Sequence, residues 1–303
     1  MDFSWIFLVL AYGLLKGFRE IAKKLALDKN SIIEVLFTYT FISFLFCLPE
    51  IKDLQVIEPK FYFFIALKSL CVFTAWIFSF KSIKYLPISI FGVLDLSRVL
   101  FATFYGVVLL HETLGINQIF GLIIVTAGLL LLRYKPKFLK VIFHVEENEI
   151  QNPNNLQETK NSRTPLYVFF ALLSCFFNAT SGYFDKVLMK DLSSSQLQFT
   201  YMGFLVLYYL IYMLVKHEKF NFSVTKNVWV YLMAIMFVIG DKCLFIANAN
   251  PSSKITMMTL IKQIGTIVTI LGGKFIFKEK NIAYKLFCAA VIIAGIVLGV
   301  AVK

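Results

Sequence analysis

About ten long apolar stretches recur along the chain, separated by short polar segments. A helix of about 20 residues crosses the hydrocarbon core of a bilayer, and each stretch is close to that length. The stretches are too long for barrel strands, and their apolar residues do not alternate with polar ones. We therefore predict an all-α, polytopic membrane protein with about ten transmembrane helices. The expected spans are 3–24, 31–49, 60–80, 86–110, 116–133, 166–187, 197–215, 227–247, 253–275 and 284–302.

One polar segment, at about residues 134–165, is much longer than the others. It is rich in Asn and Glu and contains no apolar run long enough to cross a membrane. Such a segment is typical of a linker between two parts of a chain. We expect a first five-helix repeat at 1–133, a polar linker at 134–165 and a second five-helix repeat at 166–303.

The two halves share short matches that occur in the same order. The matched pairs are Phe37-Thr38-Tyr39 with Phe199-Thr200-Tyr201, Lys24 with Lys186, Glu112 with Glu279, and Ala127-Gly128 with Ala294-Gly295. Consecutive repeats with an odd number of spans enter the membrane from opposite sides. The sequence therefore predicts two inverted repeats, related by a pseudo-two-fold axis in the membrane plane.

Two segments carry a resemblance to a known family. They are LLHETLGINQIFGLIIVTAGLLLL at 109–132 and FIFKEKNIAYKLFCAAVIIAGIVLGV at 275–300, each a Glu-containing turn followed by a Gly-rich apolar helix. In these features the chain resembles the drug/metabolite transporter superfamily, specifically the EamA-like transporters. The resemblance implies ten helices in two inverted repeats, which move small metabolites through a central cavity by alternating access. The chain departs from many members in its first span, where Tyr12-Gly13 and a charged stretch stand in place of a Trp.

Composition agrees with a lipid environment and argues against other partners. Hydrophobic residues make up 59% of the 303 residues, and charged residues only 16%. The net charge of +12 comes mainly from Lys and Arg in short segments between apolar runs, not from one basic face, so we expect no nucleic-acid partner. The five cysteines lie in apolar runs without a CxxC pair, which is typical of small buried side chains.

Ionisable residues inside the spans are the most informative feature for mechanism. Each costs about 2.5–3.5 kcal/mol in the hydrocarbon on insertion scales, and is tolerated when it is paired or faces a watery cavity. Cations outnumber acids at these positions, which favours a substrate with a carboxylate or phosphate, and a zwitterion also fits. The deep positions are Lys68, Asp95, Arg98, Asp241, Lys242 and Lys262.

Several of these residues have more than one interpretation. Asp95 and Arg98 share a helix face and can pair, either as a structural ion pair or with Arg98 as a docking cation. At the repeat offset Asp95 corresponds to Lys262, which suggests a direct contact as a hypothesis. Asp241 and Lys242 diverge by about 100° on a helix, so one can face the cavity while the other bonds to a neighbour. A polar stripe on span 253–275 faces protein or water; it comprises Thr256, Thr259, Lys262, Gln263, Thr266 and Thr269.

The first span also carries charges along one face. Either its helix ends early and the charges are interfacial, or the helix continues along the cavity wall. Tyr39 and Tyr201 occupy equivalent positions in the two halves, and Asn178 matches Lys16. The candidate substrate-binding residues are Arg98, Lys262, Asp95, Gln263, Lys242, Asp241, Tyr39, Tyr201, Lys68, Asn178, Tyr12 and Lys16.

The sequence favours a secondary transporter for a small anionic or zwitterionic metabolite, such as an amino acid or an organic or phosphorylated acid. It lacks a P-loop, so the chain does not hydrolyse ATP to drive itself. It also lacks HExxH, an Asp-rich metal motif and a Cys–His cluster, so we expect no enzyme, no metal and no cofactor. A lipid-carrier flippase, or a subunit of one, is the alternative.

Other properties are expected or left open at this point. We expect a multi-pass protein of a bacterial inner (plasma) membrane. Most loop Lys and Arg lie on the side away from the termini, so the positive-inside rule places both termini outside, whereas the family resemblance places them in the cytoplasm. Ion or proton coupling, transport direction and oligomeric state stay open. Glu112 and Glu279 are expected to be helix-end acids rather than proton sites. Two roles account for glycine at certain positions, either as points where the helices flex or as sites of close helix packing. These positions are Gly13, Gly17, Gly265, Gly272 and Gly273.

Overall fold

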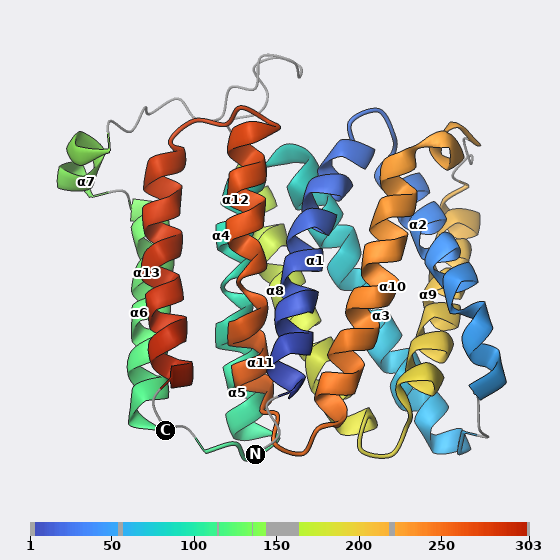
Figure 1. Ribbon diagram of the computed structural model, residues 1–303. Helices are drawn as coiled ribbons and strands as arrows, with labels where there is room; N and C mark the ends of the chain where they lie inside the picture. The colour runs from blue at the N-terminus through green and yellow to red at the C-terminus, as the bar shows by residue number, and fades with distance from the viewer. Residues whose placement is uncertain are drawn as a thin grey trace.

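A computed structural model describes residues 4–53, 57–113, 115–134, 136–143, 164–217 and 222–301, and every element within them is helical. Figure 1 shows most of the helices running side by side, with both termini at the same end. The elements are α1 Ser4–Ala26, α2 Ile32–Cys47, η1 Leu48–Asp53, α3 Pro59–Tyr85, α4 Ile88–Asp95, α5 Arg98–Val108, α6 Ile116–Tyr134, α7 Lys137–Ile142, α8 Thr164–Leu188, α9 Ser194–Lys216, η2 Phe222–Lys226, α10 Val228–Ala249, α11 Ile255–Lys262, α12 Gly265–Phe275 and α13 Ile282–Ala301.

The prediction of an all-α protein with several membrane-spanning helices is confirmed. Within the described residues, 7 helical segments are long and apolar enough to cross a membrane. Large apolar side chains on the outside of the bundle stay exposed, for example Phe7 at 73% and Phe63 at 69%. In water such a surface would be unfavourable, whereas in a bilayer it contacts lipid.

Two of the expected spans differ from the prediction, because each is divided into two helices. The span at 86–110 is interrupted between α4 and α5 at Leu96 and Ser97, and the span at 253–275 between α11 and α12 at Gln263 and Ile264. At each break the backbone bonds reach back three residues rather than four, as in the 3.1 Å bond from Leu96 N–H to the Val93 carbonyl. Both breaks lie part-way through the bundle (Figure 1).

The predicted linker at 134–165 is only partly described. It contains the short helix α7, and residues 144–163 lie outside the described residues. The domain boundaries therefore stay a prediction.

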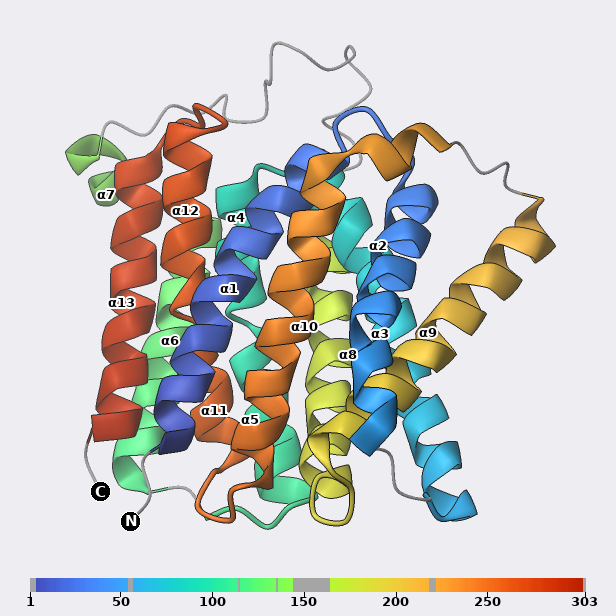
Figure 2. The same cartoon turned by 45° about the vertical axis from the view of Figure 1, so that its right-hand side comes forward.

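Helix packing pairs elements of the first half with elements of the second. Helix α1 packs along α10 and α3 along α8, while α2 packs on α9 and α6 on α13. The divided helices also pack across the halves, α4 with α12 and α5 with α11. Figures 1 and 2 place α1, α3, α8 and α10 in the middle of the bundle and the α6–α13 pair at one edge.

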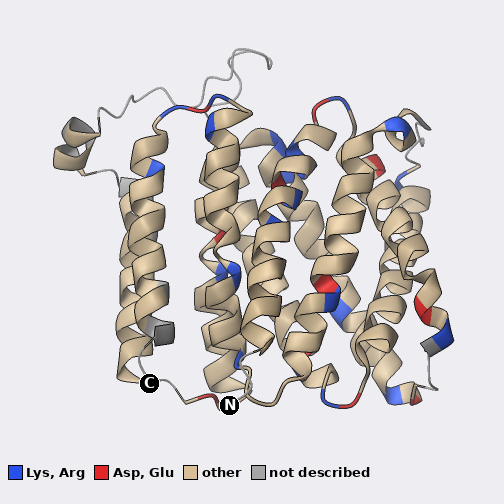
Figure 3. Ribbon diagram, in the orientation of Figure 1, with Lys and Arg blue, Asp and Glu red and all other residues tan. Residues whose placement is uncertain are grey.

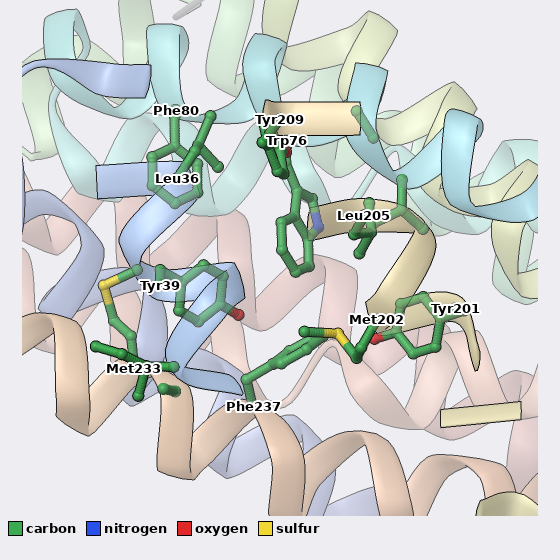
Figure 4. Packing of buried hydrophobic residues seen from close by; sticks show 14 of the residues in the cluster. Leu36, Tyr39, Trp76, Phe80, Tyr201, Met202, Leu205, Tyr209, Met233 and Phe237 are labelled. Atoms are coloured by element: carbon green, nitrogen blue, oxygen red, sulfur yellow. The ribbon is translucent and has the colours of Figure 1, made fainter. Parts of the chain in front are cut away.

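An aromatic cluster fills the space between α2, α3 and α10. The Tyr39 ring lies 5.2 Å from Trp76 and 5.5 Å from Phe237, measured between ring centroids, and Trp76 meets Phe237 edge to face (Figure 4). Such pairs add about 0.5–1.5 kcal/mol each beyond the burial of their area. The cluster is part of the buried core between these helices.

Glycines bring α1 against the break between α11 and α12. A Cβ atom on Gly17 would lie 2.5 Å from the Gly265 carbonyl oxygen, and one on Gly265 would lie 2.2 Å from the Gly13 carbonyl oxygen. These backbones can approach so closely only because none of the three residues carries a side chain. Close packing therefore explains these glycines, and their role as flex points stays a prediction.

Candidate functional site

A cavity of about 60 Å³ lies at the centre of the bundle, between α1, α3, α8 and α10. Charged and polar side chains line it together with the aromatic cluster. Figure 3 shows that charged residues occur part-way along the helices as well as at their ends. From α1 the lining residues are Tyr12, Lys16, Arg19, Glu20 and Lys23.

The charged face of α1 belongs to this cavity and not to the membrane surface. The helix continues to Ala26, and Lys16, Arg19, Glu20 and Lys23 are each at most 8% exposed. The interpretation in which the first helix ends early is therefore wrong, and the alternative along the cavity wall is confirmed.

Helix α8 provides the opposite wall from the matching positions of the second half. At the spacing that relates Lys24 to Lys186, the α1 residues Lys16, Arg19 and Lys23 correspond to Asn178, Ser181 and Asp185. All six side chains line the cavity. Equivalent faces of the two halves thus enclose one space.

Asp95 is the acid at the end of α4, and two cations share it. Lys16 donates to one carboxylate oxygen, and Arg98 Nη2 lies 2.7 Å from the other. The predicted Asp95–Arg98 pair is confirmed. The hypothesis of a contact with Lys262 is wrong, because no ion pair among the described residues joins Asp95 to Lys262. Helix α1 packs against both breaks, and its Lys16 contacts the Asp95 carboxylate where Lys262 was expected.

A second set of interactions connects α3, α8, α9 and α10. Lys68 Nζ lies 3.2 Å from Asp185 Oδ1 and 3.5 Å from the centroid of the Tyr201 ring. The Tyr201 hydroxyl donates a hydrogen bond to Asp241. Lys68 is 2% exposed, so it is buried and does not extend to the headgroups.

Arg19 and Lys262 are buried cations that lie against aromatic rings. Within the described residues neither forms an ion pair. The Arg19 guanidinium lies 5.0 Å from the centroid of Phe237 and 6.0 Å from that of Tyr12, and Lys262 Nζ lies 5.8 Å from the Tyr12 centroid. Cation–π contacts compensate only part of the cost of burying a charge. These two cations are therefore available to an anionic group.

The structure places the predicted residues in four environments. Gln263 is fully buried at the break after α11 and does not line the cavity. Lys242 is directed away from the cavity and lies 3.0 Å from Glu50 and 2.7 Å from the Ser195 hydroxyl, as the divergence from Asp241 predicts. Asp95 lines a second cavity of about 10 Å³. The main cavity is lined by Arg98, Lys262, Asp241, Tyr39, Tyr201, Lys68, Asn178, Tyr12 and Lys16.

Sequence reasoning leaves out several lining residues. Asp185, the partner of Lys68, lies near the end of an expected span, where a charge is unremarkable; its match to Lys23 is the signal that identifies it. Trp76 carries no signal, because an aromatic residue in an apolar span is common. Arg19 could not be separated from an interfacial residue by position alone.

Glu112 and Glu279 lie outside the cavity, where each caps a helix of the other half. Glu112, after α5, accepts from the N–H groups of Ile255 at 2.7 Å and Thr256 at 3.3 Å, at the start of α11. Glu279, after α12, accepts from the N–H group of Ile88 at 2.6 Å, at the start of α4. A carboxylate at a helix start satisfies free donors and the positive end of the helix dipole. The expectation of helix-end acids is confirmed.

Residues 3–134 match the model of the EamA-like transporter family. Over this part, which is less than half of the chain, the protein is similar to EamA-like transporters. The recognition made from the turn and helix at 109–132 is thereby confirmed. The fold of the chain is also found among solved structures, of which 24 chains match. One of them, titled "Crystal structure of protein", has a TM-score of 0.63 and 13% identity, over 99% of this chain and 98% of that chain. A search of curated proteins gives no match.

Family and structure agree on the general class of the molecule. EamA-like proteins are membrane transporters, and the chain has the apolar helices that such a protein needs.

Proposed function

We propose that the protein is a secondary transporter that moves a small anionic or zwitterionic metabolite by alternating access, with its ten transmembrane helices in two inverted five-helix repeats. The observation that carries the proposal is the pair of buried cations, Arg19 and Lys262, which face the central cavity and form no ion pair with any described residue. A soluble substrate with a carboxylate or phosphate would supply the negative charge that balances these two cations.

The inverted repeat is supported by the reciprocity of the two halves. The α4–α5 and α11–α12 breaks follow the matched residues Asp95 and Lys262. The two caps are reciprocal too, since Glu112 of the first half holds α11 and Glu279 of the second half holds α4. A two-fold axis between the halves, as the proposed inverted repeat requires, would relate each of these features to its counterpart.

The volume of the cavity supports a closed conformation in a transport cycle. Pockets for small ligands usually measure about 300–1,000 Å³, whereas 60 Å³ accommodates only a few water molecules. The caps lie at opposite ends of the bundle, because α5 and α11 meet near the termini and α4 and α12 meet at the other end (Figure 1). In the proposed cycle, one end opens by releasing its cap while the other end stays closed.

Transport is tested with purified protein in liposomes, incubated with a defined mixture of organic acids, phosphorylated acids and amino acids. We expect saturable uptake of an anionic or zwitterionic compound without ATP, measured by mass spectrometry of the vesicle contents. Arg19→Gln and Lys262→Gln should lower this uptake, whereas Lys52→Gln, at an exposed position, should not. Uptake no greater than in protein-free liposomes would contradict the proposal.

Alternating access is tested by locking one end. A Cβ atom on Gly273 of α12 would lie 3.2 Å from the Ser89 Cβ of α4, a little inside the separation of about 3.5–4.5 Å in a disulfide. Oxidation of the Ser89→Cys/Gly273→Cys variant should stop transport, and a reductant should restore it. Each single cysteine variant is the matched control. Full transport by the cross-linked protein would show that α4 and α12 need not separate.

Three finer points stay predictions: the lipid-carrier flippase alternative, the bacterial inner membrane and coupling to an ion or a proton.

A further inference from the structure

The charged groups around the main cavity do not balance. The cations are Lys16, Arg19, Lys23, Lys68, Arg98 and Lys262, and the acids are Glu20, Asp95, Asp185 and Asp241. Six cations against four acids leave an excess of two positive charges. All ten side chains are largely buried, the most exposed being Arg98 at 12%.

The pairing within this set shows where the excess lies. Lys23 lies 2.6 Å from Glu20, Lys68 pairs with Asp185, and Lys16 and Arg98 share Asp95. Arg19 and Lys262 have no acid within ion-pair distance among the described residues. Asp241 accepts from the Tyr201 hydroxyl instead of from a cation.

The two remaining cations both lie against the ring of Tyr12. Both face Tyr12, with Arg19 at 6.0 Å and Lys262 at 5.8 Å from its centroid. An anion bound beside Tyr12 would therefore be attracted by both. The guanidinium presents a planar fork that fits two oxygen atoms of a phosphate or carboxylate, and the ammonium adds a point charge.

Asp241 determines how the negative charge of the ligand is distributed. It lines the same cavity with its carboxylate held by Tyr201, so a second anionic group at that end would be repelled. An extended dicarboxylate is therefore disfavoured. A ligand with two negative charges on one small group would balance the two cations and avoid repulsion by Asp241. A phosphate monoester carries close to two negative charges at neutral pH.

We propose that the main cavity binds a phosphate monoester, with its dianionic head group between Arg19 and Lys262 beside Tyr12. This inference rests on the proposed transport function and names its substrate class. The remainder of the ligand extends toward Asp241 and Tyr201, where it meets hydrogen-bonding groups. The same head group occurs in soluble phosphorylated metabolites and in phosphatidic acid.

The test compares two probes of nearly the same shape that differ by one charge. Binding of methyl phosphate and methyl sulfate is measured by calorimetry at pH 7.5 on purified protein in phosphatidylcholine nanodiscs. We expect methyl phosphate to bind at least tenfold more tightly than methyl sulfate. Because the second phosphate pKa is near 6, this preference should shrink at pH 5. Equal binding of the two probes at pH 7.5 would overturn the proposal.

Variants locate the binding in the cavity. Arg19→Gln and Lys262→Gln should each weaken methyl phosphate at least tenfold, Arg19→Lys should weaken it less, and Lys52→Gln should leave it unchanged. Thermal melting of each variant verifies folding, and Arg19→Lys keeps the charge should Arg19→Gln fail to fold. An affinity for methyl phosphate that is unchanged in all the cavity variants would overturn the proposal.

Two further comparisons separate the possible outcomes. If phosphatidic acid added to the nanodiscs displaces methyl phosphate, the head group belongs to a lipid; if it does not, the ligand is soluble, and both results support the phosphate site. Glycine binding that depends on Arg19, without methyl phosphate binding, overturns this inference but leaves the proposed transport intact. Methyl phosphate binding in the cavity without uptake of any phosphate monoester contradicts the transport function and retains the site.

Discussion

Lys68 and Asp185 illustrate how single charges are held inside the bundle. The pair joins α3 to α8, and both side chains are at most 7% exposed. Removing one partner of a buried ion pair leaves an uncompensated charge, whereas replacing both by apolar groups removes the problem. The pair therefore affects stability mainly because breaking it leaves one buried charge without its partner.

We predict that Lys68→Met destabilises the protein by about 3–5 kcal/mol, because Asp185 then stays buried without its cation. The double variant Lys68→Met/Asp185→Leu should recover most of this loss. Thermal melting of purified protein in detergent measures both. Lys60→Ala, at the exposed Lys60–Glu58 pair, is the control and should melt like the parent. A Lys68→Met protein as stable as the parent would contradict the prediction.

At the scale of helices, the caps and the glycine contacts fix how elements meet. Glu279 accepts from two backbone N–H groups at the start of α4, at 2.6 Å from Ile88 and 3.1 Å from Ser89. No residue within α4 itself supplies this cap. The start of α4 therefore depends on a residue far along the chain.

Glu279→Ala should destabilise the protein by about 3–5 kcal/mol, because the first N–H groups of α4 lose their acceptor and the buried Lys285, 3.6 Å from Glu279, loses its acidic partner. Glu279→Gln keeps one acceptor oxygen and should cost less. Chemical or thermal unfolding monitored by circular dichroism measures the order of the three proteins. Equal stability of Glu279→Ala and the parent would show that water replaces the cap without cost.

Gly17→Ala should destabilise the protein by about 1–3 kcal/mol, because its Cβ would meet the Gly265 carbonyl oxygen at 2.5 Å and force α1 away from α12. Gly203→Ala, in the middle of α9, is the matched control. Its Cβ would meet only Phe44, at 3.7 Å, so it should be neutral or stabilising by up to about 1 kcal/mol. The same melting assay distinguishes the two, and identical melting curves would contradict the close packing.

Apolar run length is enough to predict where the helices lie, because each helix must cover the same thickness of hydrocarbon. It does not reveal the breaks at Leu96–Ser97 and Gln263–Ile264, where no proline stands. Cavity residues with a repeat match, such as Lys16 with Asn178, can be selected from the sequence. The Lys68–Asp185 pair cannot, because it depends on how α3 packs on α8.

At the scale of the whole molecule, the termini lie at one end and the α1–α2 loop at the other (Figure 1). Lys29 in that loop is exposed, and so is Ser252 in the α10–α11 loop at the end that holds the termini. Lys29 and Ser252 are therefore expected on opposite sides of the membrane. The charge bias and the family resemblance disagree on which of these sides is cytoplasmic.

Lys29→Cys and Ser252→Cys should therefore react with a membrane-impermeant maleimide from opposite sides. Labelling of intact cells and of inverted vesicles measures the side, with the parent protein as control because its described cysteines are buried or only partly exposed. The side on which Ser252→Cys reacts is also the side of the termini. Reaction of both variants from the same side would contradict the number of membrane crossings.

The crossed caps have a consequence for any shorter gene that encodes only one of the two halves. Such a product would contain a glutamate with no helix to cap and a helix with no glutamate, so it would be incomplete as a monomer. Under the proposed inverted repeat, a second copy inserted upside down would provide both missing partners. A lone half would therefore assemble as a dual-topology dimer, in which the two copies have opposite orientations in the membrane. The two halves of this chain, co-expressed as separate fragments, should likewise reassemble only with opposite orientations.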